Sequence, residues 1–235
     1  MRQSLSCQSM SAVIKQMHRG ICRYGFTGCI CRVASLAGQW IVSLTHADQR
    51  HVWYHLDLSH ERPLIILPVG LGIVRAGTDE LPLLEQFPTI GLFEARRRLA
   101  SGTDLWIVRE GQQPVFACWT FHDRMPVLAA HGGWLELPKG IVGLEDSVKS
   151  PAYRGRAIAP GAWATIADIL TREGVTGILT KIEETNLTCR RSIEKVGFRA
   201  VASMRLVRTL AKSHVQCQPD AEGDVPAFLT AHLTH

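Results

Sequence analysis

The second half of the chain alternates strand-like and helix-like segments, and this order restricts the fold more than any other feature of the sequence. Strands are predicted at 141–148, 175–183 and 198–208, and helices at 161–174 and 186–197. Two strands joined through a helical crossover can pair in parallel, so a neighbouring parallel pair is expected here. The sequence therefore predicts an α/β (α+β) fold, in which this pair joins antiparallel strands of the first half in one mixed sheet.

The first half contributes most of the antiparallel strands. Its apolar runs and helical periodicities predict strands at 51–58, 64–74, 105–110 and 115–121, and helices at 78–87 and 90–102. The strands at 105–110 and 115–121 are close enough in sequence to form a hairpin. Pro63 and Pro68 limit where a ladder can run in the second segment. Residues 224–233 are compatible with either a strand or a short helix.

The loop YRGRAIAP, residues 153–160, leads into the first of the two crossover helices. The first N–H groups of a helix have no partner within it, and small residues let an anion approach them. Arg154 and Arg156 add positive charge, and Pro160 suits a first helical turn. Taken alone, these residues favour an ordinary capped helix start with two solvated arginines. A nucleotide-hydrolysing P-loop is excluded because no GK[ST] follows the loop.

Two segments in this order resemble the signatures of the GCN5-related N-acetyltransferases. The first is VKSPAYRGRAIAPGAWATIADIL, beginning at Val148, and the second is NLTCRRSIEKVGFR, beginning at Asn186, with a strand between them. Their pattern of strand, [RQ]-x-x-G-x-[GA] loop and helix, and then N-x-x-[AS] with K-x-G-F, is similar to that of the family. The resemblance covers residues 144–200. It implies a mixed, mostly antiparallel sheet with a splayed parallel strand pair, flanked by helices.

The resemblance also implies a co-substrate, acetyl-coenzyme A or another acyl-coenzyme A, and no metal. In the family, the loop holds the pyrophosphate through backbone amides, and the pantetheine arm enters between the two parallel strands. The donor-binding residues that the resemblance implies are Ser147, Val148, Arg154, Gly155, Arg156, Ala157, Ile158, Ala159 and Asn186. The expected reaction is direct attack of a primary amine on the thioester, without an acyl-enzyme.

A base is needed to remove a proton from the ammonium form of the acceptor. Glu145 and then Asp146 are the first candidates, because they lie on the strand that should face the acyl group. Successive strand residues point to opposite faces, so only one of them can be catalytic. Glu184 and His122 are further candidates. Ordinary surface polarity is the alternative for each of these residues.

Two positions depart from the family pattern. Ala157 stands where the loop has its first family glycine, and alanine tolerates a positive φ poorly. Near-helical backbone is expected at this point, so Ala157 should be accommodated. Ile193 stands where many relatives have a tyrosine that protonates the leaving thiolate. The thiolate can also leave unassisted, because the pKa of a thiol is near ~8.5.

The sequence leaves the acceptor open. A small-molecule or peptide amine, and a longer acyl chain delivered by an acidic acyl carrier protein to Arg96, Arg97 and Arg98, are both compatible with it. A non-catalytic acyl-coenzyme A-binding module on the same fold is the third alternative. A homodimer is compatible with the sequence as well. The net charge of +5 is too modest to predict a nucleic-acid partner.

Composition predicts a cytoplasmic protein without a membrane span. No apolar stretch is long enough to cross a bilayer, and seven scattered cysteines suit a reducing compartment. Cys22, Cys29 and Cys31 lack the second ligand pair of a usual zinc site. Residues 1–47 are basic and free of acids, which suggests a leader or a poorly ordered extension. One acyltransferase domain is predicted at 48–212, followed by a tail at 213–235 with a further strand as one option.

Overall fold

The computed structural model describes residues 46–87, 91–209 and 213–234. The chain divides into two compact units. One comprises residues 1–48 with 207–213, and the other comprises residues 49–206 with 214–235. Of the first unit, the described parts are the first residues of one strand, the last residues of another and a single residue of a third. The second unit carries the fold and the candidate site.

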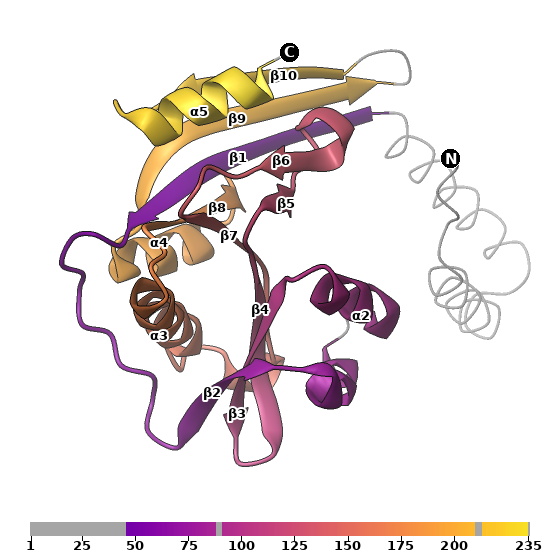
Figure 1. Ribbon diagram of the computed structural model, residues 1–235, viewed down its shortest axis with the longest axis vertical. Coiled ribbons are helices and arrows are strands. Elements are labelled where there is room, and N and C mark those ends of the chain that lie inside the picture. Colours follow the sequence, from indigo (N-terminus) through magenta and orange to yellow (C-terminus); the bar gives the residue numbers. More distant parts are fainter. Residues whose placement is uncertain (1–45, 88–90, 210–212, 235) are drawn as a thin grey trace, which may run out of the picture. The chain divides into compact units, whose positions relative to one another are not determined.

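An eight-stranded sheet forms the centre of the fold (Figure 1). Its strands are β1 (His46–Asp57), β2 (Leu71–Ala76), β3 (Asp104–Glu110), β4 (Gln113–Phe121), β7 (Ile141–Lys149), β8 (Gly177–Glu183), β9 (Arg199–Thr209) and β10 (Ser213–Pro219). Their order is β10-β9-β1-β8-β7-β4-β3-β2. The pairs β1–β8, β2–β3, β3–β4 and β4–β7 are antiparallel, and β7–β8 is parallel. The predicted mixed, mostly antiparallel sheet with one parallel pair is confirmed.

Helices cover both faces of this sheet. They are η1 (Thr78–Gln86), α2 (Leu92–Ala100), α3 (Ile158–Arg172), α4 (Leu187–Val196) and α5 (Asp224–Leu233). A small hairpin of β5 (Arg124–Pro126) and β6 (Trp134–Glu136) forms a second sheet. Two short turns of 3₁₀ helix, η2 (His131–Gly133) and η3 (Pro151–Tyr153), complete the secondary structure. In Figure 1, α3 and α4 lie on one side of β7 and β4, and α2 lies on the other.

The alternation of side chains along β1 shows how the sheet separates two apolar cores. Val52, Tyr54 and Leu56 belong to the core that includes residues of α3 and α4, whereas Trp53 belongs to the core that includes residues of α2, the β5–β6 hairpin and α5. Neighbouring strand residues point to opposite faces, so one strand serves both cores. Burial of apolar surface on both faces is the main stabilising contribution to such a layered fold.

The amphipathic pattern of α3 and α4 explains why they cover one face. Trp163, Ile166 and Leu170 of α3 are buried at helical spacing, as predicted. Asn186 is the N-cap of α4, and its Oδ1 accepts a hydrogen bond from the backbone N–H of Cys189 at 3.2 Å. Gly197 ends α4 with a φ of 107°, a conformation that favours glycine.

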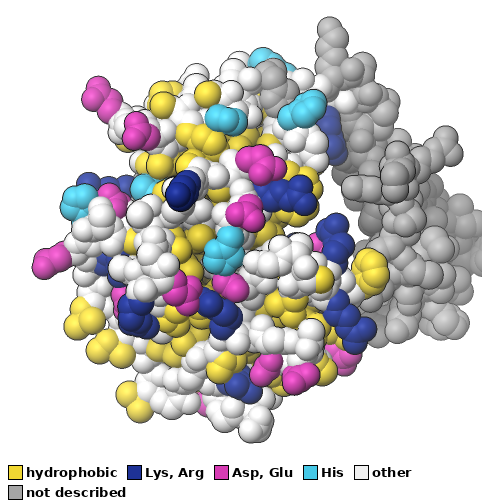
Figure 2. Space-filling view, in the orientation of Figure 1, with side chains coloured by type: hydrophobic (Ala, Val, Ile, Leu, Met, Phe, Trp, Pro, Cys, Tyr) yellow, Lys and Arg dark blue, Asp and Glu magenta, His cyan; other side chains and the backbone are white. Residues whose placement is uncertain are grey.

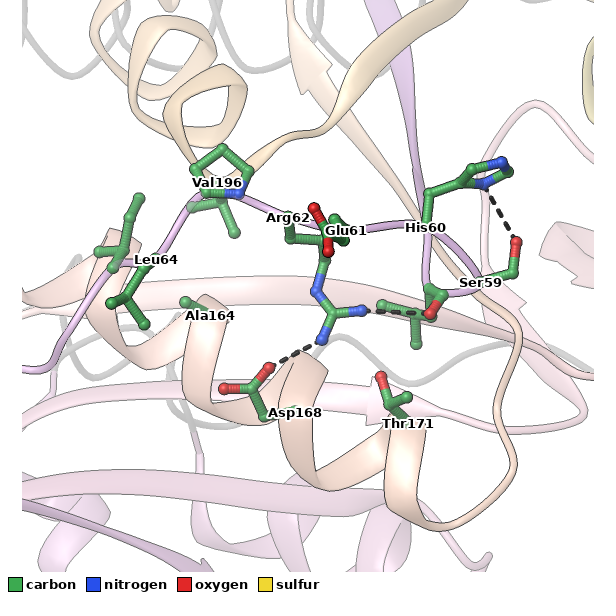
Figure 3. Close-up of a pocket in the computed structure, with 12 residues that line it drawn as sticks. Ser59, His60, Glu61, Arg62, Leu64, Ala164, Asp168, Thr171 and Val196 are labelled. Carbon is green, nitrogen blue, oxygen red and sulfur yellow. Dashed lines mark hydrogen bonds and ion pairs between the residues drawn. The ribbon is translucent and has the colours of Figure 1, made fainter.

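The segment between β1 and β2 differs from the prediction. A strand was expected over 64–74, but strand structure begins only at Leu71, and residues 58–70 pass along α3 as an irregular segment. Arg62 fixes it there (Figure 3): the guanidinium donates to Asp168 Oδ1 at 2.7 Å and to the Leu58 carbonyl at 3.3 Å. Gly161 allows a close approach, since a Cβ atom there would lie 2.8 Å from Leu67 Cα. Tertiary packing on α3 has replaced the ladder that apolar residues alone suggested.

This segment and α3 border a cavity of about 390 Å³, and Figure 3 shows the residues that line it. Arg62 and its ion pair with Asp168 lie across the cavity rather than beside it. The segment 78–87 was predicted as a helix, and Thr78–Gln86 forms a 3₁₀ helix that contains Pro82. At the C-terminal end, residues 224–233 form the helix α5, which resolves the choice left open between a strand and a helix.

Candidate functional site

The two parallel strands β7 and β8 stop pairing soon after they meet. Their paired residues are Ile141 with Gly177, Val142 with Ile178, and Gly143 with Leu179. Beyond this point β7 continues along β4, and β8 continues along β1. We call the unpaired stretch that follows Gly143 and Leu179 the β7–β8 gap. It is the splayed strand pair that the family resemblance implied.

A β-bulge in β7 lies directly at this gap. Ala117 of β4 is opposite Val148 and Trp119 is opposite Glu145, so Asp146 and Ser147 together face the single residue Cys118. Asp146 has a φ of 53°, which is unusual for a residue other than glycine. Bulges of this kind redirect side chains and release backbone groups from the ladder. Here the bulge separates the directions of the two candidate acids.

Glu145 lies inside the gap. Its Oε2 is 2.8 Å from Lys181 Nζ, and its Oε1 is 3.4 Å from the backbone nitrogen of Lys181. The side chains of Glu145 and Lys181 are only 12% and 15% exposed. Burial raises the pKa of the Glu145 carboxyl, and the neighbouring Lys181 ammonium partly opposes that rise. A carboxylate with a raised pKa is suited to accept a proton near neutral pH.

Asp146 points away from this pair and is exposed. Its carboxylate accepts a hydrogen bond from Arg98 Nη1 of α2 at 2.6 Å. The Arg98 guanidinium also lies over the rings of Trp119 and Phe121, at 5.3 and 5.5 Å from their centroids. Asp146 therefore belongs to a contact between the bulge and α2, whereas Glu145 belongs to the gap.

The loop before α3 has an unusual backbone. Gly155 has a φ of 81°, and Ala157, the N-cap of α3, has a φ of 51° and a ψ of 25°. Near-helical backbone was expected at Ala157, and this expectation is wrong: the residue is left-handed. No acidic residue occupies the first turn of α3. A Cβ atom at Gly155 would meet nothing within 4 Å, so the outer side of the loop is open.

The two loop arginines differ in their surroundings. Arg156 Nη2 donates to Glu110 Oε1 at 3.1 Å, and Tyr153 OH donates to the other oxygen of Glu110 at 2.7 Å. Both hydrogen bonds hold the pKa of the Glu110 carboxyl below its usual range. Arg154 is exposed and forms no ion pair with the residues that the structure describes. Arg154 is thus the loop cation that remains open to an anion.

Replacing Ala157 with glycine is expected to stabilise the protein by about 0.5–1 kcal/mol, because the left-handed conformation strains an L-residue but not glycine. Urea unfolding of the variant measures the change. Ala159→Gly is the matched control, since Ala159 lies in the first turn of α3 with helical backbone. The same substitution there should destabilise by about 0.5–1 kcal/mol. A destabilised Ala157→Gly variant would contradict the left-handed assignment.

The remaining residues that were predicted for the site lie in different parts of the fold. Ser147 accepts a hydrogen bond from Trp163 Nε1 of α3 at 3.2 Å, and Val148 follows it on β7, while Ile158 and Ala159 begin α3. His122 Nε2 lies 2.7 Å from Asp104 Oδ2, beside a different cavity of about 530 Å³ near Gly174, at the C-terminal end of α3. Glu184 is exposed, and its Oε2 lies 3.9 Å from Nη1 of Arg50. Neither His122 nor Glu184 contacts Glu145.

Cysteine chemistry is not prominent in the described part of the chain. Cys118, Cys189 and Cys217 are free thiols, and burial raises the pKa of each; for Cys217 it rises to about 11. Within the described ranges no group of His, Cys, Asp and Glu side chains could hold a metal ion. Cys22, Cys29 and Cys31 lie outside these ranges. No described helix is long and apolar enough to cross a membrane.

Lys181 is the site residue that sequence reasoning missed. It lies in ILTKIE, where it interrupts a run of branched apolar residues on the same strand. A lysine in such a buried strand needs a partner, and that requirement was the available signal. Ile193, by contrast, is 1% exposed and packs in the core with α3, so α4 presents no hydroxyl at that position.

Comparison with known proteins supports the fold. No family model matches the sequence, and no curated protein sequence matches it. An X-ray structure of a Drosophila protein aligns over 75% of this chain and 57% of its own, with 12% identity and a TM-score of 0.51. A GNAT-family acetyltransferase from Colwellia psychrerythraea aligns over 74% and 61%, with 14% identity and a TM-score of 0.50.

A third similar structure is part of a larger, multi-domain protein. It is described as a GCN5-related glucosamine N-acetyltransferase region of a fungal multi-domain β-N-acetylglucosaminidase. The alignment covers 74% of this chain and 23% of that chain, with 18% identity and a TM-score of 0.50. Our chain therefore spans less than two thirds of each of these three chains. At such low identities, the likeness concerns the fold.

Proposed function

We propose that this protein, which has the GCN5-related N-acetyltransferase fold, is an N-acyltransferase. It would move an acetyl or other acyl group from acyl-coenzyme A to a primary amine. The observation that carries this proposal is Glu145, a buried carboxylate inside the β7–β8 gap. Burying a charge has a high desolvation cost, so a carboxylate held at the point where two strands separate calls for an explanation. A proton acceptor beside the acyl group would account for its position.

The loop before α3 supports donor binding at the same end of the gap. The N-terminus of α3 offers unpaired backbone N–H groups and the positive end of the helix dipole. Arg154 adds a cation, and Gly155 leaves the loop open to an approaching anion. The residues that would hold the pyrophosphate are Arg154, Gly155, Arg156, Ala157, Ile158 and Ala159, while Asn186 keeps its capping role at α4.

The proposed reaction needs no acyl-enzyme. Glu145 takes a proton from the ammonium group of the acceptor, and the neutral amine then attacks the thioester carbonyl carbon. A backbone N–H released by the bulge, near Ser147 or Val148, stabilises the oxyanion. The attacking nitrogen then loses its second proton to solvent, and the carbon–sulfur bond breaks. The acyl group remains on nitrogen as an amide, and the thiolate takes a proton from solvent. Cys118 and Cys189 are unsuited to nucleophilic attack because burial raises the pKa of both thiols.

The acceptor would approach Glu145 from the face of the sheet that carries α2 and the β5–β6 hairpin. Trp119 and Trp53, the residues opposite Glu145 and Lys181, belong to the apolar core on this face. Figure 2 shows acidic and basic side chains intermixed on the surface there, and a hollow between the regions that carry α2 and the hairpin. The mixture of charges supports a small polar amine as acceptor.

Isothermal titration with acetyl-, octanoyl- and palmitoyl-coenzyme A tests the proposal. Binding of at least one thioester, followed by thiol release when an amine panel is added, is the expected result. Absence of binding for all three would overturn it. Binding without thiol release for any amine would leave a non-catalytic acyl-coenzyme A-binding module on the same fold.

One observation favours an acyl carrier protein as a second donor. Phe93, Arg96 and Arg97 are exposed on one face of α2, and Phe93 is 82% exposed. An apolar side chain among cations suits an acidic protein surface, although Arg97 already pairs with Glu94 at 2.9 Å. The Phe93→Ser variant should lose thiol release from an acylated carrier protein but keep thiol release from acyl-coenzyme A. This result would establish the carrier protein as a donor.

The free thiols of the described residues fit a reducing cytoplasm.

A further inference from the structure

We infer that Lys181 is a positioning residue for the proposed acyl transfer: its ammonium group holds the Glu145 carboxylate within the β7–β8 gap and joins it to the β5–β6 hairpin. This inference rests on the proposed function for its catalytic meaning. The contacts themselves belong to the described structure and can be tested without turnover.

Three polar contacts of one residue carry the inference. Lys181 Nζ lies 2.8 Å from Glu145 Oε2 and donates to the Pro126 carbonyl oxygen at 3.3 Å. The backbone nitrogen of Lys181 lies 3.4 Å from Glu145 Oε1. Both carboxylate oxygens of Glu145 are therefore held by Lys181. The contact with Pro126 extends the arrangement to β5, so a single side chain links β7, β8 and the hairpin.

Aromatic walls enclose the ion pair. Trp119 of β4 stands opposite Glu145, and Trp53 of β1 stands opposite Lys181. Both tryptophans are fully buried, and the Nε1 atom of each has no hydrogen-bond partner among the described residues. Lys181 Nζ lies 5.9 Å from the centroid of Trp53. Because the walls are apolar, the charge of Glu145 depends on Lys181 rather than on solvent.

The other charged and titratable groups near the pair do not replace Lys181. Asp146, next to Glu145 on β7, raises the pKa of Glu145 and is itself bound to Arg98 of α2. Burial raises the pKa of the Cys189 thiol on α4, and the Glu145 carboxylate adds to that rise. Burial lowers the pKa of the His51 imidazole on β1, and the charge of Lys181 lowers it further. Among the described residues, Lys181 is the one cation within ion-pair distance of Glu145.

Removal of the ammonium group should therefore make Glu145 harder to ionise. Burial favours the protonated carboxyl, and an opposite charge in contact with a carboxylate typically lowers its pKa by about 1–3 units. A protonated Glu145 cannot accept a proton from the acceptor amine. The acid limb of the pH–rate profile should consequently move to higher pH when Lys181 loses its charge.

The test compares Lys181→Met, which keeps the length and removes the charge, with Lys181→Arg, which keeps the charge. In Lys181→Met, the apparent pKa of the acid limb in the pH profile of kcat/KM for the acceptor should increase by about 1 pH unit or more. Activity should recover at alkaline pH. In Lys181→Arg, which keeps the charge, the acid limb should stay at its wild-type pH. Equal loss of activity at every pH, or an unmoved limb, would overturn the inference.

Two further measurements keep the inference separate from the proposed function and from folding. Carbon NMR of the Glu145 carboxyl should show titration at higher pH in Lys181→Met than in wild type, whether or not the protein turns over substrate. Unchanged titration would overturn the inference even in an active enzyme. If Lys181→Met fails to fold in a thermal melt, Lys181→Gln is measured instead, with the same shift expected. Failure of the proposed function would show separately, as no thioester binding by the wild type.

Discussion

Replacing Gly155 with aspartate should weaken the binding of acyl-coenzyme A at least about 100-fold, because the carboxylate would repel the pyrophosphate at the N-terminus of α3. Nothing lies within 4 Å of a Cβ atom at Gly155, so the side chain meets no steric obstacle. The backbone φ of 81° strains any L-residue there. Isothermal titration with acetyl-coenzyme A measures the loss, and circular dichroism checks that the fold is retained.

Gly155→Asn is the matched control for this prediction. Asparagine has nearly the same shape as aspartate and tolerates left-handed backbone, but it carries no charge. Its affinity should stay within about threefold of wild type if charge repulsion dominates. Equal loss in both variants would show that the backbone of the loop, not its charge, controls binding. Full affinity in Gly155→Asp would place the pyrophosphate elsewhere.

Replacing Glu145 with glutamine should reduce kcat by about 10²- to 10⁴-fold, the usual contribution of a general base. Glutamine keeps the shape of the side chain but cannot accept the proton of the acceptor amine. The affinity for acetyl-coenzyme A should remain close to that of wild type, because the loop before α3 is unchanged. Steady-state kinetics and calorimetry on the same preparation separate these two quantities.

The same substitution should also destabilise the protein, since it leaves Lys181 buried without its counter-ion. Loss of one partner of a buried ion pair commonly costs about 3–5 kcal/mol. The double variant Glu145→Gln with Lys181→Met removes both charges, so it should recover stability in urea unfolding while activity stays low. Recovery of activity in the double variant would show that Glu145 acts through folding alone.

Asp146→Asn decides between the two adjacent acids. Asp146 is exposed and bound to Arg98, so neutralising it weakens the contact between the bulge and α2 and should leave the gap intact. A kcat loss comparable to that of Glu145→Gln would mean that the base has been assigned to the wrong residue. A small loss, accompanied by weaker acceptor binding, fits the position of Asp146 beside α2.

The elements that surround the site could be predicted because their signals are local. The spacing of Trp163, Ile166 and Leu170 marks α3, and Asn186 and Gly197 mark the two ends of α4. Local signals failed where packing overrode propensity. The apolar run at 64–74 was predicted as a strand, but the segment before Leu71 packs along α3 through Arg62 and Asp168.

The position of β1 shows a second limit. A strand was predicted at 51–58 and β1 spans His46–Asp57, yet nothing in its sequence indicated that it lies between β8 and β9. An antiparallel neighbour with apolar residues on both faces fits many places in a sheet. Its register against β8 then decides which side chains meet, and it sets Trp53 opposite Lys181.

The sequence by itself determined the order of elements, the loop that leads into α3, and the pair Glu145 and Asp146 as candidates of which only one can act. The tertiary structure decided where each of the two side chains lies. The bulge at Asp146 directs Glu145 into the gap, and Lys181, 36 residues further along the chain, meets it there. Helical and strand periodicities arise between near neighbours, whereas an ion pair across separated strands depends on sheet register. Only the folded chain sets that register.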